Sequence, residues 1–338
     1  MKVAIFADIH INKDDDDPRR LYDKLDIIKF IKKYCVHNHI DTIIFVGDWW
    51  TNRKHLDIEV INVGYTAAEI MADNATVYAL VGNHDFYYKN ITDIHSLIPF
   101  KHIDKFHIIS EPSTLCLGEL SIMMIPYLSP IQFNETIKSI SNVDVLMVHQ
   151  TFNGFMANNG FIMDDSISTD AVKQFKLVIS GDIHKHQTIN NITYVGAPLP
   201  QDFNDLGDDF GFMVLDTDTI TLDRVLIPSR RYHKINSSSI DYSLIKDNII
   251  DVMFDGNTMW TDSDIVRVLD DINKHKPFKL TYQFSDRNID IAVDGVRNEI
   301  ESVSFNNVVS DYVKVHKFEN MDQRLILKTL SDVIEYCD

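Results

Sequence analysis

Short apolar runs alternate with helical periodicities along the first two thirds of the chain. Residues 2–7 form an apolar run rich in β-formers, and apolar side chains recur at helical spacing over residues 21–34. The alternation then repeats, with helices expected at 58–71, 131–140 and 170–175, and strands at 42–48, 76–85, 121–127, 143–150, 176–182 and 192–197. Strands that alternate with helices predict an α/β fold whose sheets are covered by helices.

The pattern changes near residue 230. Residues 228–239 are polar, basic and serine-rich, and beyond them we expect strands at 251–256, 277–284 and 311–318 around a helix at 263–274. A last helix, from Asp322, carries its apolar side chains on one face. We therefore predict three parts: a main domain at 1–230, a smaller α+β cap domain at 231–320, and a C-terminal helix at 321–338 that docks a partner or packs on the cap.

Five of the apolar strands end in groups that can bind a ligand. These groups are Asp8 and His10, Asp48, Asn83 with His84, His149, and Asp182 with His184. In open α/β sheets the carboxyl ends of strands are where ligand groups gather, because loops there turn inward over a crevice. We expect the five strand ends to meet in space.

A mixture of carboxylate, imidazole and amide oxygen suits Mn²⁺, Fe²⁺ or Zn²⁺, whereas the absence of paired cysteines argues against a structural zinc site. The set is large enough for two metal ions. Two ions about 3.5–4 Å apart, with a bridging carboxylate and hydroxide, are the usual device for in-line attack on a phosphate ester. Each motif alone is more often structural, and the case depends on five in order, each after an apolar strand.

The order of these motifs resembles that of the calcineurin-like metallophosphoesterases: D-x-H at Asp8 and His10, GD at 47–48, GNHD at 82–85, a single His149, and G-x-x-H at 181–184. The resemblance implies two packed mixed β-sheets flanked by helices. The segment YVGAPLPQDFND at 194–205 is similar, more narrowly, to the DNA-repair nuclease branch, which includes SbcD-type and bacteriophage recombination nuclease subunits.

The resemblance also implies roles for individual residues. Asp8, His10 and His184 would hold one metal ion, and Asn83, His149 and position 182 the other, with Asp48 as the bridge. His84 would act on the scissile phosphate as a catalytic residue and would not be a ligand. Asp85 would orient the ring of His84 or simply form the turn.

Position 182 departs from the family pattern, which has G-H-x-H where this chain has Gly181-Asp182-Ile183-His184. A carboxylate here would retain the second metal and shift its preference towards Mn²⁺ or Mg²⁺. The alternatives are loss of that metal or compensation by His186. We predict that Asp182 is a ligand and that the cofactor is a pair of divalent ions, with Mn²⁺ favoured over Mg²⁺, Fe²⁺ and Zn²⁺.

Several neighbouring residues have weaker claims to function. Arg53, Lys54 and His55 form a short basic cluster beside the expected crevice and are candidate DNA contacts, with Lys185, Arg230 and Arg231 as weaker ones. Each of these residues is otherwise a solvated charge. Trp49 and Trp50 are predicted to pack beneath the site, although stacking on a base is the alternative.

Composition limits what the chain can be. It has 338 residues, 45% of them hydrophobic, and no apolar run long enough to cross a bilayer. Three widely spaced cysteines argue against a disulfide framework, so we predict a cytoplasmic protein with no membrane partner. Its formal net charge is −18, and such a surface repels nucleic acid, so a DNA enzyme of this composition would need bound cations or a basic partner.

Together these observations predict a two-metal DNA phosphodiesterase, an exo- or endonuclease subunit of a DNA repair or recombination complex. The resemblance implies an SMC-like ATPase with a coiled coil as partner, and a homodimer is possible. A phosphatase or small-molecule phosphodiesterase on the same scaffold is the rival enzyme, because the metal chemistry does not depend on the attached group. A binding scaffold with a degraded site is the non-enzymatic rival.

Overall fold

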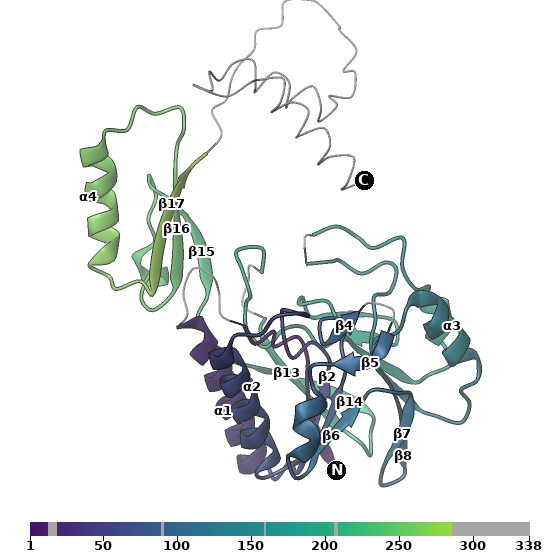
Figure 1. The fold of residues 1–338 in the computed structure, drawn as a ribbon. Helices are drawn as coiled ribbons and strands as arrows, with labels where there is room; N and C mark the ends of the chain where they lie inside the picture. The colour runs from purple at the N-terminus through teal and green to yellow at the C-terminus, as the bar shows by residue number, and fades with distance from the viewer. Residues whose placement is uncertain (13–18, 89–90, 159, 206–208, 286–338) are drawn as a thin grey trace, which may run out of the picture. The chain divides into compact units, whose positions relative to one another are not determined.

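Two six-stranded sheets and the helices around them form the main part of the structure, a computed structural model shown in Figure 1. It describes residues 1–12, 19–88, 91–158, 160–205 and 209–285. The elements are, in chain order, β1 (Lys2–Phe6), α1 (Arg20–His37), β2 (Thr42–Val46), α2 (Ile58–Ala72), β3 (Thr76–Leu80), β4 (Phe86–Tyr88), β5 (Ile91–His95), η1 (Ile98–His102), β6 (Phe106–Ile109), β7 (Ser113–Leu117), β8 (Leu120–Ile125), α3 (Pro130–Lys138), β9 (Val145–His149), η2 (Thr169–Val172), β10 (Leu177–Gly181), β11 (Gln187–Ile189), β12 (Ile192–Tyr194), β13 (Gly211–Asp216), β14 (Thr221–Leu226), β15 (Tyr232–Asn236), η3 (Tyr242–Leu244), β16 (Ile249–Phe254), α4 (Asp262–Asn273) and β17 (Lys279–Phe284).

Both large sheets are mixed. The first has the order β14-β13-β1-β2-β3-β6, and the second has the order β11-β12-β10-β9-β8-β7. In the first, β1 runs parallel to β2, with Ile5 opposite Ile44, and antiparallel to β13, with Ile5 opposite Met213. In the second, β9 lies between β8 and β10 and runs parallel to both. The carboxyl ends of β1, β2 and β3 therefore share one edge, as do those of β9 and β10.

Alternate side chains of β1 show how the layers are built. Val3 and Ile5 pack between the two sheets, against residues such as Met147 of β9. Ala4 and Phe6 point to the opposite face, where α1 and α2 cover the sheet. Since strands buried on both faces must be apolar throughout, the continuous apolar runs in the sequence are explained. The prediction of two packed mixed sheets flanked by helices is confirmed.

Capping residues determine where the helices begin, which the apolar spacing in the sequence predicted only approximately. The carboxylate of Asp57 caps α2, and Ser129 with Pro130 starts α3, which ends at Lys138, two residues before the predicted end. The helix predicted at 170–175 is a 3₁₀ turn at Thr169–Val172. No helix in the described part of the chain is both long and apolar enough to span a membrane.

A smaller parallel sheet, β15-β16-β17, follows the main part and has its own apolar cluster with α4, which includes Val252, Phe254 and Ile272. The strands predicted at 251–256 and 277–284 and the helix predicted at 263–274 are present within a few residues of these bounds. The strand at 311–318, the helix from Asp322 and the docking segment 321–338 lie outside the described residues. The division at 230 and 320 stays a prediction.

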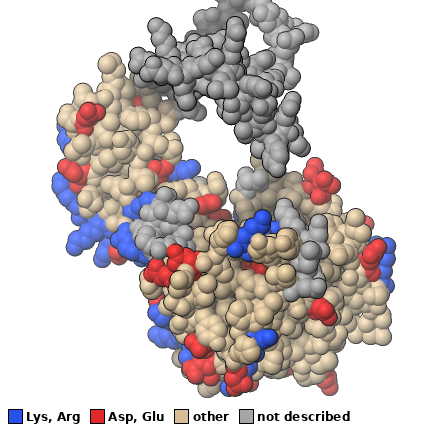
Figure 2. All heavy atoms as spheres, in the orientation of Figure 1, with Lys and Arg blue, Asp and Glu red and all other residues tan. Residues whose placement is uncertain are grey.

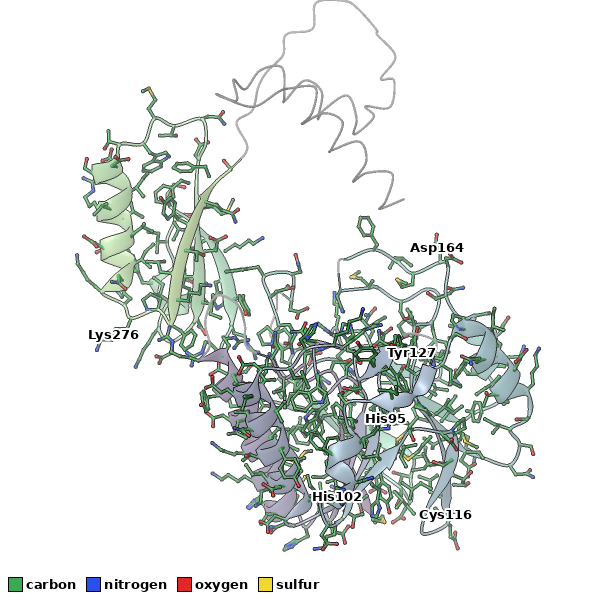
Figure 3. All side chains as sticks on the ribbon, in the orientation of Figure 1. His95, His102, Cys116, Tyr127, Asp164 and Lys276 are labelled. Carbon is green, nitrogen blue, oxygen red and sulfur yellow. The ribbon has the colours of Figure 1, made fainter. Side chains whose placement is uncertain are left out.

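Arg230 and Arg231 have partners within the protein, and their suggested contact with phosphate stays a prediction. The Arg230 guanidinium bonds both carboxylate oxygens of Asp23 and lies 3.6 Å from the centroid of the Phe278 ring. Arg231 donates to Ser229 and lies over the ring of Phe210. Other Lys and Arg side chains gather at the end of the small sheet where Lys276 lies (Figures 2 and 3).

Candidate metal centre

The predicted strand-end residues meet where the edges of the two large sheets lie together. Asp8, Asp48 and Asn83 follow β1, β2 and β3 of the first sheet, while His149 ends β9 and Asp182 follows β10 of the second. The Asp8 carboxylate joins the two sheets directly by accepting the backbone N–H of Asp182 at 3.0 Å. The site therefore exists only when the sheets are packed.

Four of these residues have left-handed backbone conformations. The φ angles are +54° at Asp8, +48° at His10, +63° at Asp48 and +87° at Asp182. Side chains other than glycine adopt this region at a cost, and such strain clusters at functional sites. The turns direct the polar side chains of successive strands towards one another.

Glycines give the ligands room. A Cβ at Gly47, whose φ is +95°, would lie 2.3 Å from Nδ1 of His149. A Cβ at Gly82 would lie 2.2 Å from Oδ1 of Asp48. The glycines of the GD and GNHD motifs are thus required by the close approach of the site residues.

Asp48 lies at the centre of the cluster. Its Oδ1 is 3.3 Å from Nε2 of His149, and its Oδ2 is 3.6 Å from Nε2 of His10. Two groups of possible ligand atoms share Asp48, each within 4.8 Å: His10 with His84, and Asp8 with His149. A carboxylate shared by two groups is the arrangement that a bridging ligand requires.

The ring of His149 is fixed in the orientation of a metal ligand. Its Nδ1 donates to the carbonyl of Val46 at 2.7 Å, which leaves Nε2 to face Oδ1 of Asn83 at 3.1 Å and Oδ1 of Asp182 at 3.8 Å. Although burial opposes it, the charge of Asp48 raises the pKa of His149 well above its usual value. In the metal-free protein the extra proton supplies the positive charge that these oxygens lack.

Burial and neighbouring charges also shift the pKa values of the two carboxylates and of His10. Burial raises the pKa of Asp8 to about 7, against the charges of His149 and His184. At Asp48 burial is outweighed by His149, whose charge and hydrogen bond lower the pKa of the carboxyl. Burial lowers the pKa of His10 well below its usual range. The cluster is short of positive charge.

The donor set fits divalent ions. Nδ1 of His10 is buried and has no hydrogen-bond partner among the described residues. The other possible ligands are carboxylate oxygens, imidazole nitrogens and one amide oxygen, which suit hard or borderline dications. Bound cations would supply the missing charge and use the oxygens and nitrogens that now face one another.

Asp182, the departure from the family motif, has its carboxylate at the edge of this cluster. Its Oδ1 faces Nε2 of His149, and its Oδ2 accepts a hydrogen bond from Thr151. Neither Asp182 nor His186 is in the two ligand groups, but the Nδ1 of His186 donates to the carbonyl of Tyr194 and His186 has no hydrogen bond or ion pair with the proposed ligands among the described residues. This geometry favours Asp182 over His186 as a ligand, and the role stays a proposal.

His184 is held from a segment that the sequence analysis did not assign. Its Nδ1 contacts Oδ2 of Asp205 at 3.2 Å, and its ring centroid lies 5.1 Å from that of His10. Against the effect of burial, the Asp205 hydrogen bond raises the pKa of His184. Asp205 also accepts the N–H of Gln201, whose side chain donates to the carbonyl of Asp8. Only the carboxylate–histidine pairing seen in metal sites could have suggested Asp205 beforehand.

His84 and Asp85 have separate tasks. Nδ1 of His84 contacts the carbonyl of Thr51 at 2.8 Å, so Thr51 orients the ring. The buried Asp85 carboxylate instead accepts the backbone N–H groups of Gly82, Asp48, Trp49 and Trp50. This geometry favours the turn-forming alternative for Asp85 and gives no support to a catalytic role.

The remaining candidates lie around the site. Trp49 and Trp50 are buried in the core beneath α2, as the packing alternative predicts. In the loop after these tryptophans, Lys54 and His55 are exposed and Arg53 is half-buried. Tyr127, which follows β8, was not predicted as a site residue (Figure 3). Burial and, to a smaller extent, the negative charge of Asp182 raise the pKa of its hydroxyl, whereas the positive charge of Arg53 lowers it. The backbone N–H of Tyr127 donates to the carbonyl of Val81, directly after β3.

Comparison with known proteins decides the family. Residues 1–186, more than half of the chain, match the family described as Calcineurin-like phosphoesterase. The chain belongs to this family. Calcineurin-like phosphoesterases use divalent metal ions to hydrolyse phosphate esters, and the clustered ligand groups described above agree with that chemistry.

Two relatives narrow the comparison. The chain is 27% identical to "Exonuclease subunit 1" of Enterobacteria phage T4 over 72% of this chain and 73% of the relative. It is also 27% identical to "Putative phosphoesterase 244L" of Invertebrate iridescent virus 6, over 59% of this chain and 73% of that relative. The structure is also similar to that of the calcineurin-like phosphoesterase YfkN from Bacillus subtilis, which is 12% identical; the superposition covers 81% of this chain and 96% of that chain at a TM-score of 0.39.

Proposed function

We propose that this calcineurin-like phosphoesterase is a two-metal DNA phosphodiesterase, an exo- or endonuclease subunit that acts in DNA repair or recombination. The observation that supports the proposal is the position of Asp48, whose two carboxylate oxygens face Nε2 of His10 and Nε2 of His149, one residue from each proposed ligand set. The phage relative, named an exonuclease subunit and alignable over 72% of this chain, supports DNA as the substrate.

Each residue then has a defined task. Asp8, His10 and His184 would hold one ion, Asn83, His149 and Asp182 would hold the other, and Asp48 would be shared between them. When bound, the ions polarise the phosphate and activate water for in-line attack, with Mn²⁺ the expected metal. His84, oriented by Thr51, donates from Nε2 to the phosphate or the leaving oxygen.

The charge of the protein supports a partner. At a net charge of −18 the chain needs either metal ions or a basic surface on another subunit to hold DNA. The relative's name describes one subunit of an exonuclease, which supports a partner subunit. We propose that this partner is an ATPase of the SMC type, with a homodimer as the other assembly considered. A cytoplasmic location is part of the proposal, because Cys35 and Cys116, two of the chain's three cysteines, are both free.

The rival function is a phosphatase or small-molecule phosphodiesterase. The viral phosphoesterase relative, 27% identical over 59% of this chain, favours it as the second candidate. A metal-free binding scaffold is the third reading, and the well-formed ligand cluster weighs against it.

The deciding experiment uses the purified full chain with Mn²⁺ on linear DNA, closed circular DNA, bis(p-nitrophenyl) phosphate and p-nitrophenyl phosphate. We expect DNA cleavage that excess EDTA abolishes and that Asp48→Asn lacks. Robust cleavage in EDTA would contradict the metal-dependent mechanism. Hydrolysis of the chromogenic esters with intact DNA would select the rival, and no hydrolysis of any substrate would select the scaffold.

A further inference from the structure

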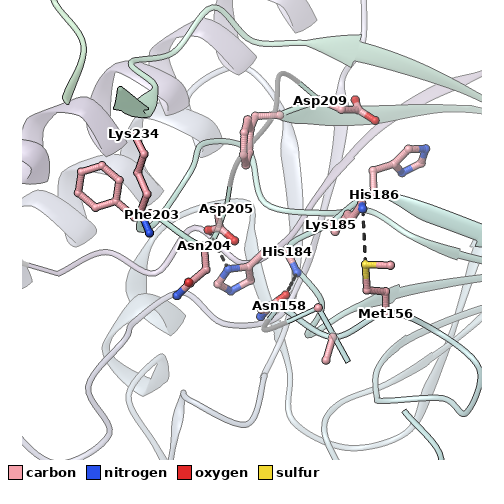
Figure 4. A pocket seen from close by; sticks show the side chains of 13 residues that line it. Met156, Asn158, His184, Lys185, His186, Phe203, Asn204, Asp205, Asp209 and Lys234 are labelled. Atoms are coloured by element: carbon pink, nitrogen blue, oxygen red, sulfur yellow. Dashed lines mark hydrogen bonds and ion pairs between the residues drawn. The ribbon is translucent and has the colours of Figure 1, made fainter. Parts of the chain in front are cut away.

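A pocket of about 550 Å³ opens beside the metal centre (Figure 4). We call it the His184 pocket, after the residue that it shares with the centre. Its wall includes Lys185, His186, Phe203, Asn204, Phe210 and Lys234. Its volume lies within the range of about 300–1,000 Å³ that is typical of ligand sites. A group bound here would lie against the same imidazole that is proposed to hold a metal ion.

Charge in the His184 pocket is unevenly paired. Asp205 bonds His184, and Asp209 bonds Arg224, so both carboxylates in the wall already have partners. Lys234 and Lys185 have no carboxylate partner among the described residues; Lys185 contacts only the sulfur of Met156, at 3.6 Å. In a chain of net charge −18, two such lysines beside a phosphoesterase centre indicate an anionic ligand.

An aromatic platform stands next to these lysines. The half-buried ring of Phe203 packs edge to face against Tyr232 at 4.8 Å, and Nζ of Lys234 lies 5.8 Å from its centroid. Tyr232 donates to the carbonyl of Gln201, whose side chain donates in turn to the carbonyl of Asp8. Backbone and side-chain bonds therefore connect the platform with the centre.

We propose that the His184 pocket binds the nucleotide next to the scissile phosphate in a single DNA strand. The base stacks on Phe203, and the flanking phosphate contacts Lys234 and Lys185. Aromatic rings with adjacent cations are the usual means of binding single strands without reading sequence. This inference rests on the proposed DNA function and adds where the substrate strand lies.

The first test does not require DNA cleavage. With bis(p-nitrophenyl) phosphate as reporter and Mn²⁺ present, dAMP should inhibit wild-type protein more strongly than inorganic phosphate does. In Phe203→Leu the inhibition constant of dAMP should rise about tenfold more than that of phosphate, because one stacked base is lost. Equal inhibition by dAMP and phosphate, or equal changes for both in Phe203→Leu, would overturn the proposal.

The second test uses single-stranded oligonucleotides. Lys234→Gln should lower kcat/KM on the oligonucleotide about fivefold more than on the small ester and should weaken its salt dependence. Lys138→Gln, an exposed lysine at the end of α3, is the matched control and should change neither. An equal loss of kcat/KM on the oligonucleotide and on the small ester would refute the proposal that Lys234 contacts the DNA strand. If wild-type protein binds dAMP as expected but cleaves no DNA, the DNA function fails while the nucleotide pocket remains.

Discussion

At the scale of single residues, three histidines of the centre each use Nδ1 in a hydrogen bond within the protein. His149 bonds Val46, His184 bonds Asp205 and His84 bonds Thr51, each through Nδ1. In every case Nε2 is left for a ligand or a substrate. Such outer contacts fix the ring and its tautomer, so the chain presents preformed donors rather than flexible ones.

His84 separates metal binding from catalysis. We expect His84→Gln to keep metal content near wild type, measured by mass spectrometry of the desalted protein, while kcat falls by about a hundredfold or more, because proton donation is lost. His102→Gln, on the exposed end of η1, is the control. Loss of one metal equivalent in His84→Gln would instead make His84 a ligand, as its position near His10 and Asp48 allows.

Asp182 tests the altered motif. Asp182→Ala should raise the Mn²⁺ concentration for half-maximal activity, because a facing carboxylate contributes both charge and a ligand atom. Asp182→His should restore a family-like site that tolerates Zn²⁺ or Co²⁺ better while needing more Mn²⁺ than wild type. Three superimposable Mn²⁺ titrations of wild type and the two variants would show that Asp182 is not a ligand.

Proton release should report metal binding. Asp8, with a pKa raised to about 7, is largely protonated at pH 6 and largely ionised at pH 8 in the metal-free protein. Mn²⁺ binding must therefore displace more protons at pH 6 than at pH 8, and because His149 and His184 also have raised pKa values, the apparent affinity falls as the pH drops across this range. Calorimetry in buffers of different ionisation enthalpy measures the difference. Equal release at both pH values would mean that Asp8 does not bind the ion as the anion.

At the scale of elements, one carboxylate joins two ligand loops. Asp85 accepts N–H groups from its own loop after β3 and from the loop after β2, so the positions of Asp48 and Asn83 depend on each other. The ends of neighbouring parallel strands thus act as one rigid part of the site.

Replacement of Asp85 should reveal this coupling. Asp85→Asn loses one acceptor oxygen, so buried N–H groups face an amide NH₂, and we expect about 1–3 kcal/mol lower stability in urea unfolding. Mn²⁺ affinity should fall as well, although Asp85 contacts no proposed ligand atom. Asp104→Asn, an exposed position, is the control. Unchanged stability would show that the four bonds contribute little.

The elements also show what the sequence could reveal. Strands β1, β2, β3, β9 and β10 were predictable because both of their faces are buried, so each is an apolar run that leads to a proposed ligand residue, whereas the equally buried β13 was not predicted. Strands such as β14 and β15 were missed because they lie at sheet edges with few buried side chains. Asp205, Thr151 and Tyr127 were missed because only the folded loops bring them to the centre.

At the scale of the whole molecule, the proposed ligands are divided between two sheets. Asp8, His10, Asp48 and Asn83 come from the first sheet, and His149, Asp182 and His184 follow strands of the second. Separation of the sheets would therefore dismantle the centre, so metal binding and sheet packing support each other.

Metal should consequently stabilise the fold. At Mn²⁺ concentrations about a hundredfold above Kd, the free energy of unfolding should rise by about 2.7 kcal/mol per ion, seen as a higher Tm in calorimetry. Asp48→Asn should lose most of this shift. A Tm that does not change on addition of Mn²⁺ or EDTA would mean that the native state binds no ion preferentially.

The pairing of β1 with β13 has a consequence for synthesis of the protein. Lys2 lies opposite Asp216, so during synthesis β1 gains its partner on one side only when the chain has grown past residue 216. Until then, β1 can pair only with β2, and one apolar edge stays open to other chains. We expect the nascent protein to depend on chaperones during this interval, and truncations that end before β13 to aggregate.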